Sequence, residues 1–393
     1  GSLPEPRRAT LRTLRGPDGG DLDRAIVLWF EAPHTATGHD VVEFHLHGGR
    51  AVVAAVERAL SSVPRLRAAE AGEFTRQALI SGRIDLTEAE GLGDLLEAET
   101  ETARRAALQT SGGSVRRLTE DWTSTVLGIA AQVEAMLDHA DEDDVAVAAS
   151  EDIARQCEAI ASQMTEALDQ PSVERLKDGI HVVLAGPPNA GKSTLLNRVV
   201  DREVAIVSPI AGTTRDRIEA SIQRNGIAYV FSDTAGLAIE TDDPIEAIGI
   251  ARAREAAASA DIVLWLDDQP PPIDLRAKTI AILARCDEPG RRGGKDRLPV
   301  SGATGEGVAE LWTRIEQRAS ELVPRLDGAL LNRRQRELLG RARDALRDVG
   351  EVGDLLIAAE NIRMARGALD RITGRADVEA VLDGIFSRFC IGK

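Results

Sequence analysis

The stretch IHVVLAGPPNAGKSTLLNRVV, residues 180–200, decides the fold of the middle of this chain. It starts with an apolar run typical of a buried strand and ends with a helical run. Between them, residues 186–193 fit the pattern G-x-x-x-x-G-K-S/T, in which glycines let backbone N–H groups approach phosphates at the start of a helix. A strand, this loop and a helix in that order predict a phosphate site in a doubly wound α/β domain.

The residues of this loop have separate predicted roles. Lys192 is expected to reach the β- and γ-phosphates of a nucleotide, and the Ser193 hydroxyl is expected to ligate Mg²⁺. The other nucleotide contacts predicted here are Asn189, Ala190, Gly191 and Thr194.

Two further motifs indicate a nucleoside triphosphatase switch. A predicted strand at residues 227–231 leads into Asp233, Thr234, Ala235 and Gly236. There the carboxylate can hold Mg²⁺ through water and the Gly236 N–H can sense the γ-phosphate. Between this motif and the phosphate loop, residues 212–216 read Gly-Thr-Thr-Arg-Asp and provide a hydroxyl for the Mg²⁺ shell.

The segment that would read the base is altered. GTPases usually read guanine with N-K-x-D after the fifth strand, and here Ala284, Arg285, Cys286 and Asp287 stand in that place. The Asp287 carboxylate can accept from guanine N1–H and from the 2-amino group, whereas adenine offers neither donor. Arg285 can replace the lysine by stacking on the base. We predict GTP selectivity with weakened affinity.

A second base-facing loop is expected further along the chain. Ser301, Gly302 and Ala303 resemble the S-A-K loop of GTPases, with a change. We count all three among the predicted nucleotide contacts.

The chain of 393 residues is long enough for two or three domains. Residues 1–98 predict a small α+β unit, and residues 177–323 alternate strands and helices. Apolar residues spaced by three and four in 99–176 and 324–393 predict amphipathic helices. We therefore expect a discontinuous helical domain with an α/β domain inserted into it. Residue 1 is not Met and Gly-Ser is a common cloning remnant, so we expect the native N-terminus to be missing.

Composition restricts the class of protein. The formal net charge of -16 repels nucleic-acid backbones, so any RNA is expected to be shared with a partner. No run approaches the roughly 18 apolar residues of a membrane span. The three cysteines, Cys157, Cys286 and Cys390, form no C-x-x-C pair, which favours a reducing compartment and a cytoplasmic protein.

Three further stretches extend these motifs to the whole chain. They are VVEFHLHGG at residues 41–49, GEFTRQALISGRIDLTEAE at 72–90 and the terminal FCIGK at 389–393. With the phosphate loop, G-T-T-R-D and D-T-A-G, they resemble the MnmE (TrmE) family of tRNA-modification GTPases. The resemblance implies an N-terminal α+β domain that forms a homodimer and binds 5-formyltetrahydrofolate or a related one-carbon folate. It also implies a discontinuous helical domain and an inserted P-loop, Ras-like G domain.

The resemblance also implies roles for individual residues. A K⁺ ion replaces the arginine finger of other GTPases, and its matching ligands are Asn189, Ser208, Ile210 and Thr213. The matching Mg²⁺ ligands are Ser193 and Thr214, and Ser208, Thr213 and Thr214 are also counted as nucleotide contacts.

The catalytic and folate residues follow from the same resemblance. Glu246 matches the glutamate that orients the attacking water, although taken alone it would be a surface helix residue. Cys390 matches the cysteine held to serve the modification, although it can equally be a packed apolar residue. Glu43, Arg83 and Lys393 match the folate contacts, and the family usually has lysine in place of Arg83.

The implied function is GTP hydrolysis during carboxymethylaminomethyl-type modification at C5 of the tRNA wobble uridine, together with the FAD-containing partner MnmG. One alternative is a nucleotide-binding scaffold with a degenerate G domain, which the altered base motif keeps open. Another is a ribosome-assembly GTPase, against which the N-terminal signatures and the terminal C-x-G-K argue.

Overall fold

The computed structural model describes residues 3–138, 143–200, 204–205, 219–233, 254–291, 296–351 and 354–376, together with Leu382, Phe386 and Phe389. These residues fall into two compact units. Unit 1 takes its residues from 1–96, 110–128 and 366–393, and unit 2 takes them from 97–109 and 129–365. The division into three domains stays a prediction.

Unit 2 contains the predicted doubly wound sheet. Its strand order is β10-β9-β8-β4-β7-β6-β5, with β4 (Ile180–Ala185) between β7 (Ile227–Asp233) and β8 (Ile262–Trp265). The other strands are β5 (Val204–Ala205), β6 (Glu219–Arg224), β9 (Thr279–Ala284) and β10 (Leu298–Val300). Neighbours from β10 to β7 run parallel, and β6 and β5 continue the sheet antiparallel. The strands expected at the start of residues 180–200 and at residues 227–231 are therefore confirmed.

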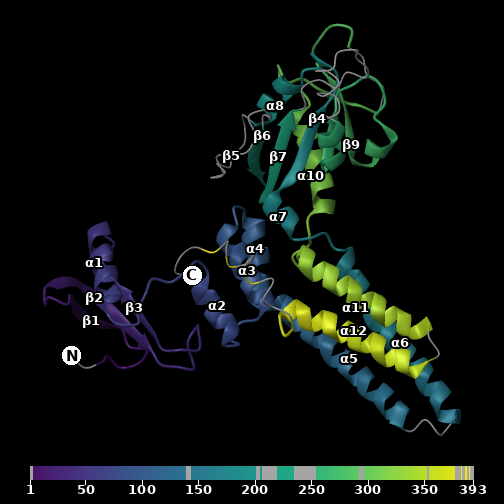
Figure 1. Ribbon diagram of the computed structural model, residues 1–393. Coiled ribbons are helices and arrows are strands. Elements are labelled where there is room, and N and C mark those ends of the chain that lie inside the picture. Colours follow the sequence, from purple (N-terminus) through teal and green to yellow (C-terminus); the bar gives the residue numbers. More distant parts are fainter. Residues whose placement is uncertain are drawn as a thin grey trace, which may run out of the picture. The chain divides into compact units, whose positions relative to one another are not determined.

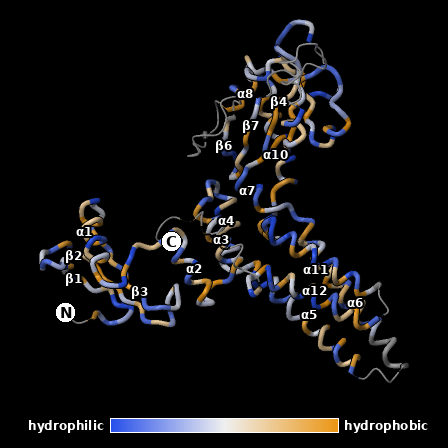
Figure 2. The backbone as a smooth tube through the Cα atoms, in the orientation of Figure 1, coloured by the Kyte–Doolittle hydropathy of each residue, from blue (hydrophilic) through white to orange (hydrophobic). Residues whose placement is uncertain are grey.

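Both faces of this sheet are covered, which explains the apolar run of β4. Ile180, Val182 and Leu184 pack with α8 (Lys192–Val200) and α10 (Val308–Leu322) on one side. Val183 and Ala185 pack with Ala257, Ala260 and the 3-10 helix η1 (Ile273–Lys278) on the other. A parallel strand buried on both faces reads as continuous apolar sequence. Figure 1 shows β4 inside the sheet, and its hydrophobic residues are orange in Figure 2.

The helical part of unit 2 is built around α6 (Asp143–Asp169) and α11 (Arg333–Glu351), which pack along each other. The buried positions recur every three or four residues in both helices, as the sequence predicts. They include Ile153, Cys157, Ile160 and Met164 in α6 and Leu339, Ala342, Leu346 and Val349 in α11. The short helix α7 (Glu174–Asp178) leads from α6 into β4, and α4 (Glu101–Ser111) lies mostly in unit 2. The helices α5 (Ser114–Asp138) and α12 (Leu355–Thr373) have residues in both units.

Unit 1 contains an antiparallel sheet in the order β1-β2-β3. Its elements are β1 (Thr10–Arg15), β2 (Asp21–Phe30), β3 (Val41–His45), α1 (Arg50–Ser61), α2 (Glu73–Ile80) and α3 (Leu86–Glu97). These elements give this part of the chain the mixed α+β character that the sequence predicts for residues 1–98. Leu382, Phe386 and Phe389 form an apolar cluster with Leu86 at the start of α3.

No helix in the described ranges is long and apolar enough to cross a membrane.

Candidate nucleotide-binding site

The phosphate loop joins the end of β4 to the start of α8. A Cβ added to Gly186 would lie 3.1 Å from Leu266 Cβ and 3.2 Å from the Leu266 carbonyl carbon, so a side chain here would fit only if Leu266 shifted. Asn189 and Gly191 have positive φ angles of 61° and 92°. Asparagine and glycine are the residues that adopt this left-handed backbone most readily. The loop sequence therefore fits the tight path from strand to helix.

Lys192 lies folded against this loop. Its side chain is buried, and Nζ donates to the carbonyl oxygens of Gly186 at 3.0 Å and Pro187 at 2.9 Å. Burial lowers the pKa of Lys192, while the nearby Asp233 carboxylate acts to raise it. A lysine held at a helix N-terminus beside a glycine-rich loop is suited to bind phosphate oxygens.

Ser193 and Asp233 come together although they lie 40 residues apart. The Ser193 hydroxyl donates to Asp233 Oδ2 at 2.5 Å. The other carboxylate oxygen, Oδ1, is buried and has no hydrogen-bond partner among the described residues. Hydroxyl and carboxylate oxygens are ligands that Mg²⁺ prefers, and an unpartnered buried oxygen is costly unless something binds it. These two residues therefore fit a Mg²⁺ ion.

At the end of β9, the altered base motif lies beside the phosphate loop. Ala284 is buried in the apolar core, and Arg285 has a left-handed backbone with φ of 58°. Arg285 Nη1 donates to the Asn189 carbonyl at 3.3 Å, and Nε donates to Glu288 Oε1 at 2.6 Å. A Cβ added to Gly191 would lie 3.5 Å from Arg285 Cγ. The arginine side chain thus runs along the loop, held in place by Glu288.

Asp287 is exposed and is oriented by Ser301. The hydrogen bond from the Ser301 side chain, followed by one from its own backbone N–H, lowers the pKa of Asp287. Ser301 is fully buried, and its hydroxyl oxygen also accepts from the Thr304 N–H at 3.0 Å. The Ser301 hydrogen bond thus favours the charged form of the carboxylate, which is a hydrogen-bond acceptor.

Arg198, near the end of α8, contacts the 301–303 loop in a way that the sequence motifs do not predict. Its Nε donates to the Gly302 carbonyl at 3.0 Å, and its Nη2 donates to the Ala303 carbonyl. An arginine near a helix end is too common a feature to be recognised from sequence. Only the return of the chain 104 residues later gives it this role.

Several predicted site residues lie outside the described residues. They are Ser208, Ile210, Thr213, Thr214, Thr234, Ala235, Gly236, Glu246, Cys390 and Lys393. The predicted contacts Ala190 and Thr194 lie within the loop and the first turn of α8, beside Lys192 and Ser193.

The two described folate candidates are exposed side chains of unit 1. Glu43 lies on β3, where Oε2 contacts His45 Nε2 at 3.2 Å. Arg83 follows α2, and its N–H donates to the Ala78 carbonyl at 2.9 Å. Among the residues that the structure describes, no hydrogen bond or ion pair joins Glu43 to Arg83.

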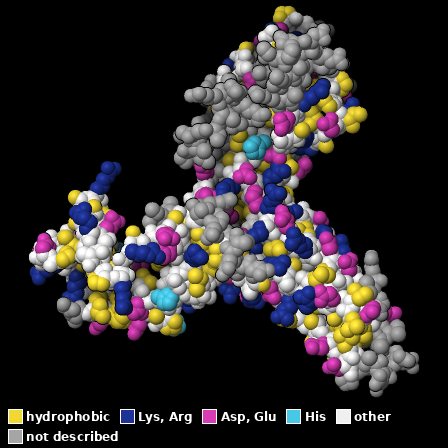
Figure 3. All heavy atoms as spheres, in the orientation of Figure 1, with side chains coloured by type: hydrophobic (Ala, Val, Ile, Leu, Met, Phe, Trp, Pro, Cys, Tyr) yellow, Lys and Arg dark blue, Asp and Glu magenta, His cyan; other side chains and the backbone are white. Residues whose placement is uncertain are grey.

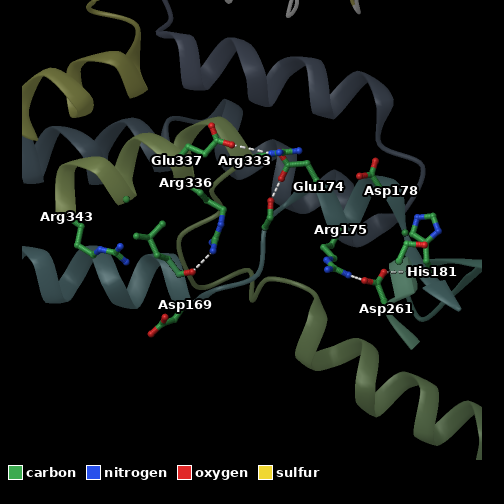
Figure 4. A pocket seen from close by; sticks show the side chains of 15 residues that line it. Asp169, Glu174, Arg175, Asp178, His181, Asp261, Arg333, Arg336, Glu337 and Arg343 are labelled. Carbon is green, nitrogen blue, oxygen red and sulfur yellow. Dashed lines mark hydrogen bonds and ion pairs between the residues drawn. The ribbon is translucent and has the colours of Figure 1, made fainter. Parts of the chain in front are cut away.

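A separate cavity of about 810 Å³ lies in unit 2 between α6, α7, α11 and the start of β4 (Figure 4). Several of its charged side chains have partners within the protein. Arg175 pairs with Asp261, Arg333 with Glu337 at 3.3 Å, and Arg336 donates to the Leu168 and Gln170 carbonyls. These contacts make the cavity a structural junction between the helical part and the sheet.

Comparison with family models and comparison with individual proteins identify the same family. The family model described as the MnmE helical domain matches residues 86–390, and the model described as GTP-binding protein TrmE N-terminus matches residues 1–83. The tRNA modification GTPase MnmE of Sphingopyxis alaskensis is 51% identical, with 100% of this chain and 96% of the relative covered. The protein of the same name from Rhizorhabdus wittichii is 52% identical, with 100% of this chain and 89% of the relative covered. This chain therefore belongs to the MnmE family, also called TrmE, whose members carry the name tRNA modification GTPase.

Proposed function

We propose that this protein is a K⁺-activated GTP hydrolase that takes part in carboxymethylaminomethyl-type modification at C5 of the tRNA wobble uridine. The observation that carries the proposal is the joint arrangement of a phosphate loop and a base-reading carboxylate around one sheet edge. Lys192 and Ser193 follow β4, Asp233 ends β7 and Asp287 follows β9. Side chains at the carboxyl ends of parallel strands share one binding crevice.

The base preference is proposed to come from Asp287. An ionised carboxylate accepts two hydrogen bonds from guanine, and adenine leaves it without either donor, which disfavours ATP. The Ser301 hydrogen bond supports this role because it lowers the pKa of Asp287 and so keeps the side chain an acceptor. Arg285, which lies along Gly191, provides a planar surface beside the loop in place of the usual lysine.

Two cations are proposed to assist hydrolysis. Ser193, Asp233 and Thr214 would hold Mg²⁺, with Ser193 and Asp233 already in hydrogen-bond contact. Asn189, Ser208, Ile210 and Thr213 would hold K⁺, which supplies positive charge between the phosphates where other GTPases use an arginine. Glu246 is proposed to orient the attacking water through a second water.

The modification itself is proposed to need other molecules. A one-carbon folate would bind Glu43, Arg83 and Lys393 in a homodimer formed by the N-terminal domain, and Cys390 would serve the modification. The FAD protein MnmG is the proposed partner. The net charge is -16, and Figure 3 shows Lys and Arg interspersed with Asp and Glu on the coloured parts of the visible face. The net negative charge supports sharing of the tRNA with the partner, because it repels phosphates.

The altered base motif favours an alternative to this function. Ala284 replaces the usual asparagine, and Gly302 stands in the other base-facing loop. A nucleotide-binding scaffold that has lost turnover would also fit these changes. Measured turnover separates the two functions.

Competition titrations of unlabelled GDP, ADP and XDP against labelled GDP test the proposed base preference. We expect the protein to prefer GDP over ADP by about tenfold or more, since ADP leaves the carboxylate unpaired. Asp287→Asn should favour XDP over GDP, because the amide donates to the 2-oxo group of xanthine. Asp274→Asn, at an exposed position in η1, is the control and should keep the preference for GDP. Equal binding of GDP and ADP by the unaltered protein would refute the proposal.

A further inference from the structure

At position 284, the predicted base-reading segment has no side chain that could hydrogen-bond to the neighbouring loops. The usual guanine motif has an asparagine there, and an amide can donate and accept hydrogen bonds across loops. Ala284 has only a methyl group and is buried among apolar residues at the end of β9. Whatever fixes the base-facing loops in this chain must therefore come from other residues.

Arg198, on α8, makes hydrogen bonds of this kind to the 301–303 loop. Nε and Nη2 of its guanidinium donate to two successive carbonyl groups, those of Gly302 and Ala303. The donors of a guanidinium are fixed in one plane, so binding two carbonyls sets the orientation of the loop as well as its distance. The loop lies directly on the helix, because a Cβ added to Gly302 would be 2.8 Å from the Leu195 backbone nitrogen.

The same loop holds Asp287. Ser301 precedes Gly302, is fully buried, and donates its hydroxyl to the Asp287 carboxylate. The Ser301 N–H donates to the Glu306 carbonyl at 2.9 Å, and its own carbonyl accepts from Gly305 at 2.9 Å. The Ser301 backbone is thus fixed within a small turn, residues 301–306. The hydrogen bonds of Arg198 to this turn set its position against α8.

We infer that Arg198 is a positioning residue for guanine recognition, which fixes the 301–303 loop and through Ser301 the Asp287 carboxylate, a function that position 284 cannot provide. The inference rests on the proposed function, because it assumes that Asp287 reads guanine. It adds a specificity-determining residue on the phosphate-loop helix, outside the base motif itself.

The test compares GDP with IDP, which lacks the 2-amino group that Asp287 would bind. Unlabelled GDP, IDP and ADP compete with labelled GDP for the full chain and for Arg198→Ala, Arg198→Lys and Arg314→Ala. Arg314 is a matched control, because it lies on α10 in an exposed pair with Glu310 at 2.9 Å. We expect Arg198→Ala to weaken GDP binding about tenfold, with a much smaller effect on IDP, so that the GDP to IDP preference falls toward one.

The other variants sharpen the comparison. Arg198→Lys keeps the charge and can donate to one carbonyl, so it should retain part of the preference, and it alone can carry the test if Arg198→Ala does not fold. Arg314→Ala should behave as the unaltered protein. A GDP to IDP preference unchanged by either Arg198 variant, or an equal loss of GDP, IDP and ADP binding, would overturn the inference. If the unaltered protein did not prefer GDP over ADP, the proposed function would fail and the inference with it. If it did prefer GDP, an unchanged preference in the Arg198 variants would overturn the inference alone.

Discussion

Ser193 and Asp233 illustrate how two motifs become one site at the scale of single residues. β4 and β7 pair in parallel, with Leu184 opposite Asp233, so the residues that follow β4 lie at the same sheet edge as Asp233. The hydroxyl and the carboxylate then meet at 2.5 Å. The carboxylate keeps one buried oxygen that no described residue binds, and a divalent cation would satisfy it.

Ser193→Ala should therefore remove most of the gain in GTP affinity that Mg²⁺ brings. We expect a loss of about tenfold or more in the presence of Mg²⁺, because a ligand to a charged group is lost. In EDTA the variant and the unaltered protein should bind GTP alike. Titration of labelled GTP in each condition measures both values, with Thr313→Ala on α10 as the control. An equal loss of GTP affinity with and without Mg²⁺ would indicate that the substitution disturbs the phosphate loop as a whole and does not remove a Mg²⁺ ligand.

Sequence alone predicts the setting of the phosphate loop, because the motif and the elements on either side of it are adjacent in the chain. The strand before the loop and the helix after it are confirmed at β4 and α8. The role of Arg198 could not be predicted in this way. Its partners Gly302 and Ala303 are far away in the chain, and the hydrogen bonds are to backbone carbonyls, which any residue supplies.

At the scale of elements, the 301–305 turn, which contains the predicted base-facing residues, packs directly on α8. Gly302 faces the backbone of α8, where a Cβ would be 2.8 Å from Leu195 N and 2.9 Å from the Thr194 carbonyl carbon. Backbone atoms of a helix cannot move aside as a flexible side chain does. The turn can approach the helix this closely only because residue 302 has no side chain.

Gly302→Ala should destabilise unit 2, by about 1–3 kcal/mol as for other overpacked positions. The matched control is Gly340→Ala within α11, where an added Cβ meets nothing within 4 Å. It should stabilise the protein by about 0.5–1 kcal/mol, since alanine favours helix over glycine. Urea unfolding followed by circular dichroism measures both. Equal effects of the two substitutions would contradict the close packing of the turn on α8.

A second contact between elements lies at the cavity of Figure 4, where Asp261 meets α7 and β4. Its carboxylate pairs with Arg175 and accepts from the His181 N–H at 2.9 Å, with only 10% of the side chain exposed. Asp261→Ala leaves a backbone donor and a cation without this partner, so we expect a loss of about 1–3 kcal/mol in unfolding free energy. Asp327→Ala removes an exposed pair with Arg325 and should change little. If thermal unfolding showed equal stability of the two variants, the Asp261 contacts would not contribute to the stability of the protein.

The amphipathic helices were predictable from the spacing of their apolar residues, whereas β1 was not. Its sequence alternates threonine, leucine and arginine, and most of its residues remain exposed. A strand with little buried surface shows weak periodicity, and only its pairing with β2 reveals it. Pairing partners of this kind cannot be identified from a single run of residues.

At the scale of the whole molecule, family membership and site geometry support each other. The family models together match almost the entire chain, and the residues predicted for phosphate, Mg²⁺ and base lie at the carboxyl ends of β4, β7 and β9 in one sheet. The base motif departs from the usual GTPase pattern, since Ala284 and Arg285 stand where asparagine and lysine are usual. Arg198 instead connects α8 to the 301–303 loop, and Arg285 connects the segment after β9 to the phosphate loop.

The most direct test of the central claim is the steady-state hydrolysis of GTP and of ATP by the full chain, each in KCl and in NaCl at equal ionic strength. The account predicts fast GTP turnover in KCl, slow GTP turnover in NaCl and little ATP turnover in either salt. Equal GTP turnover in the two salts would contradict the K⁺ site at Asn189. The absence of GTP turnover in both salts, with nucleotide still bound, would contradict the enzyme and favour the scaffold.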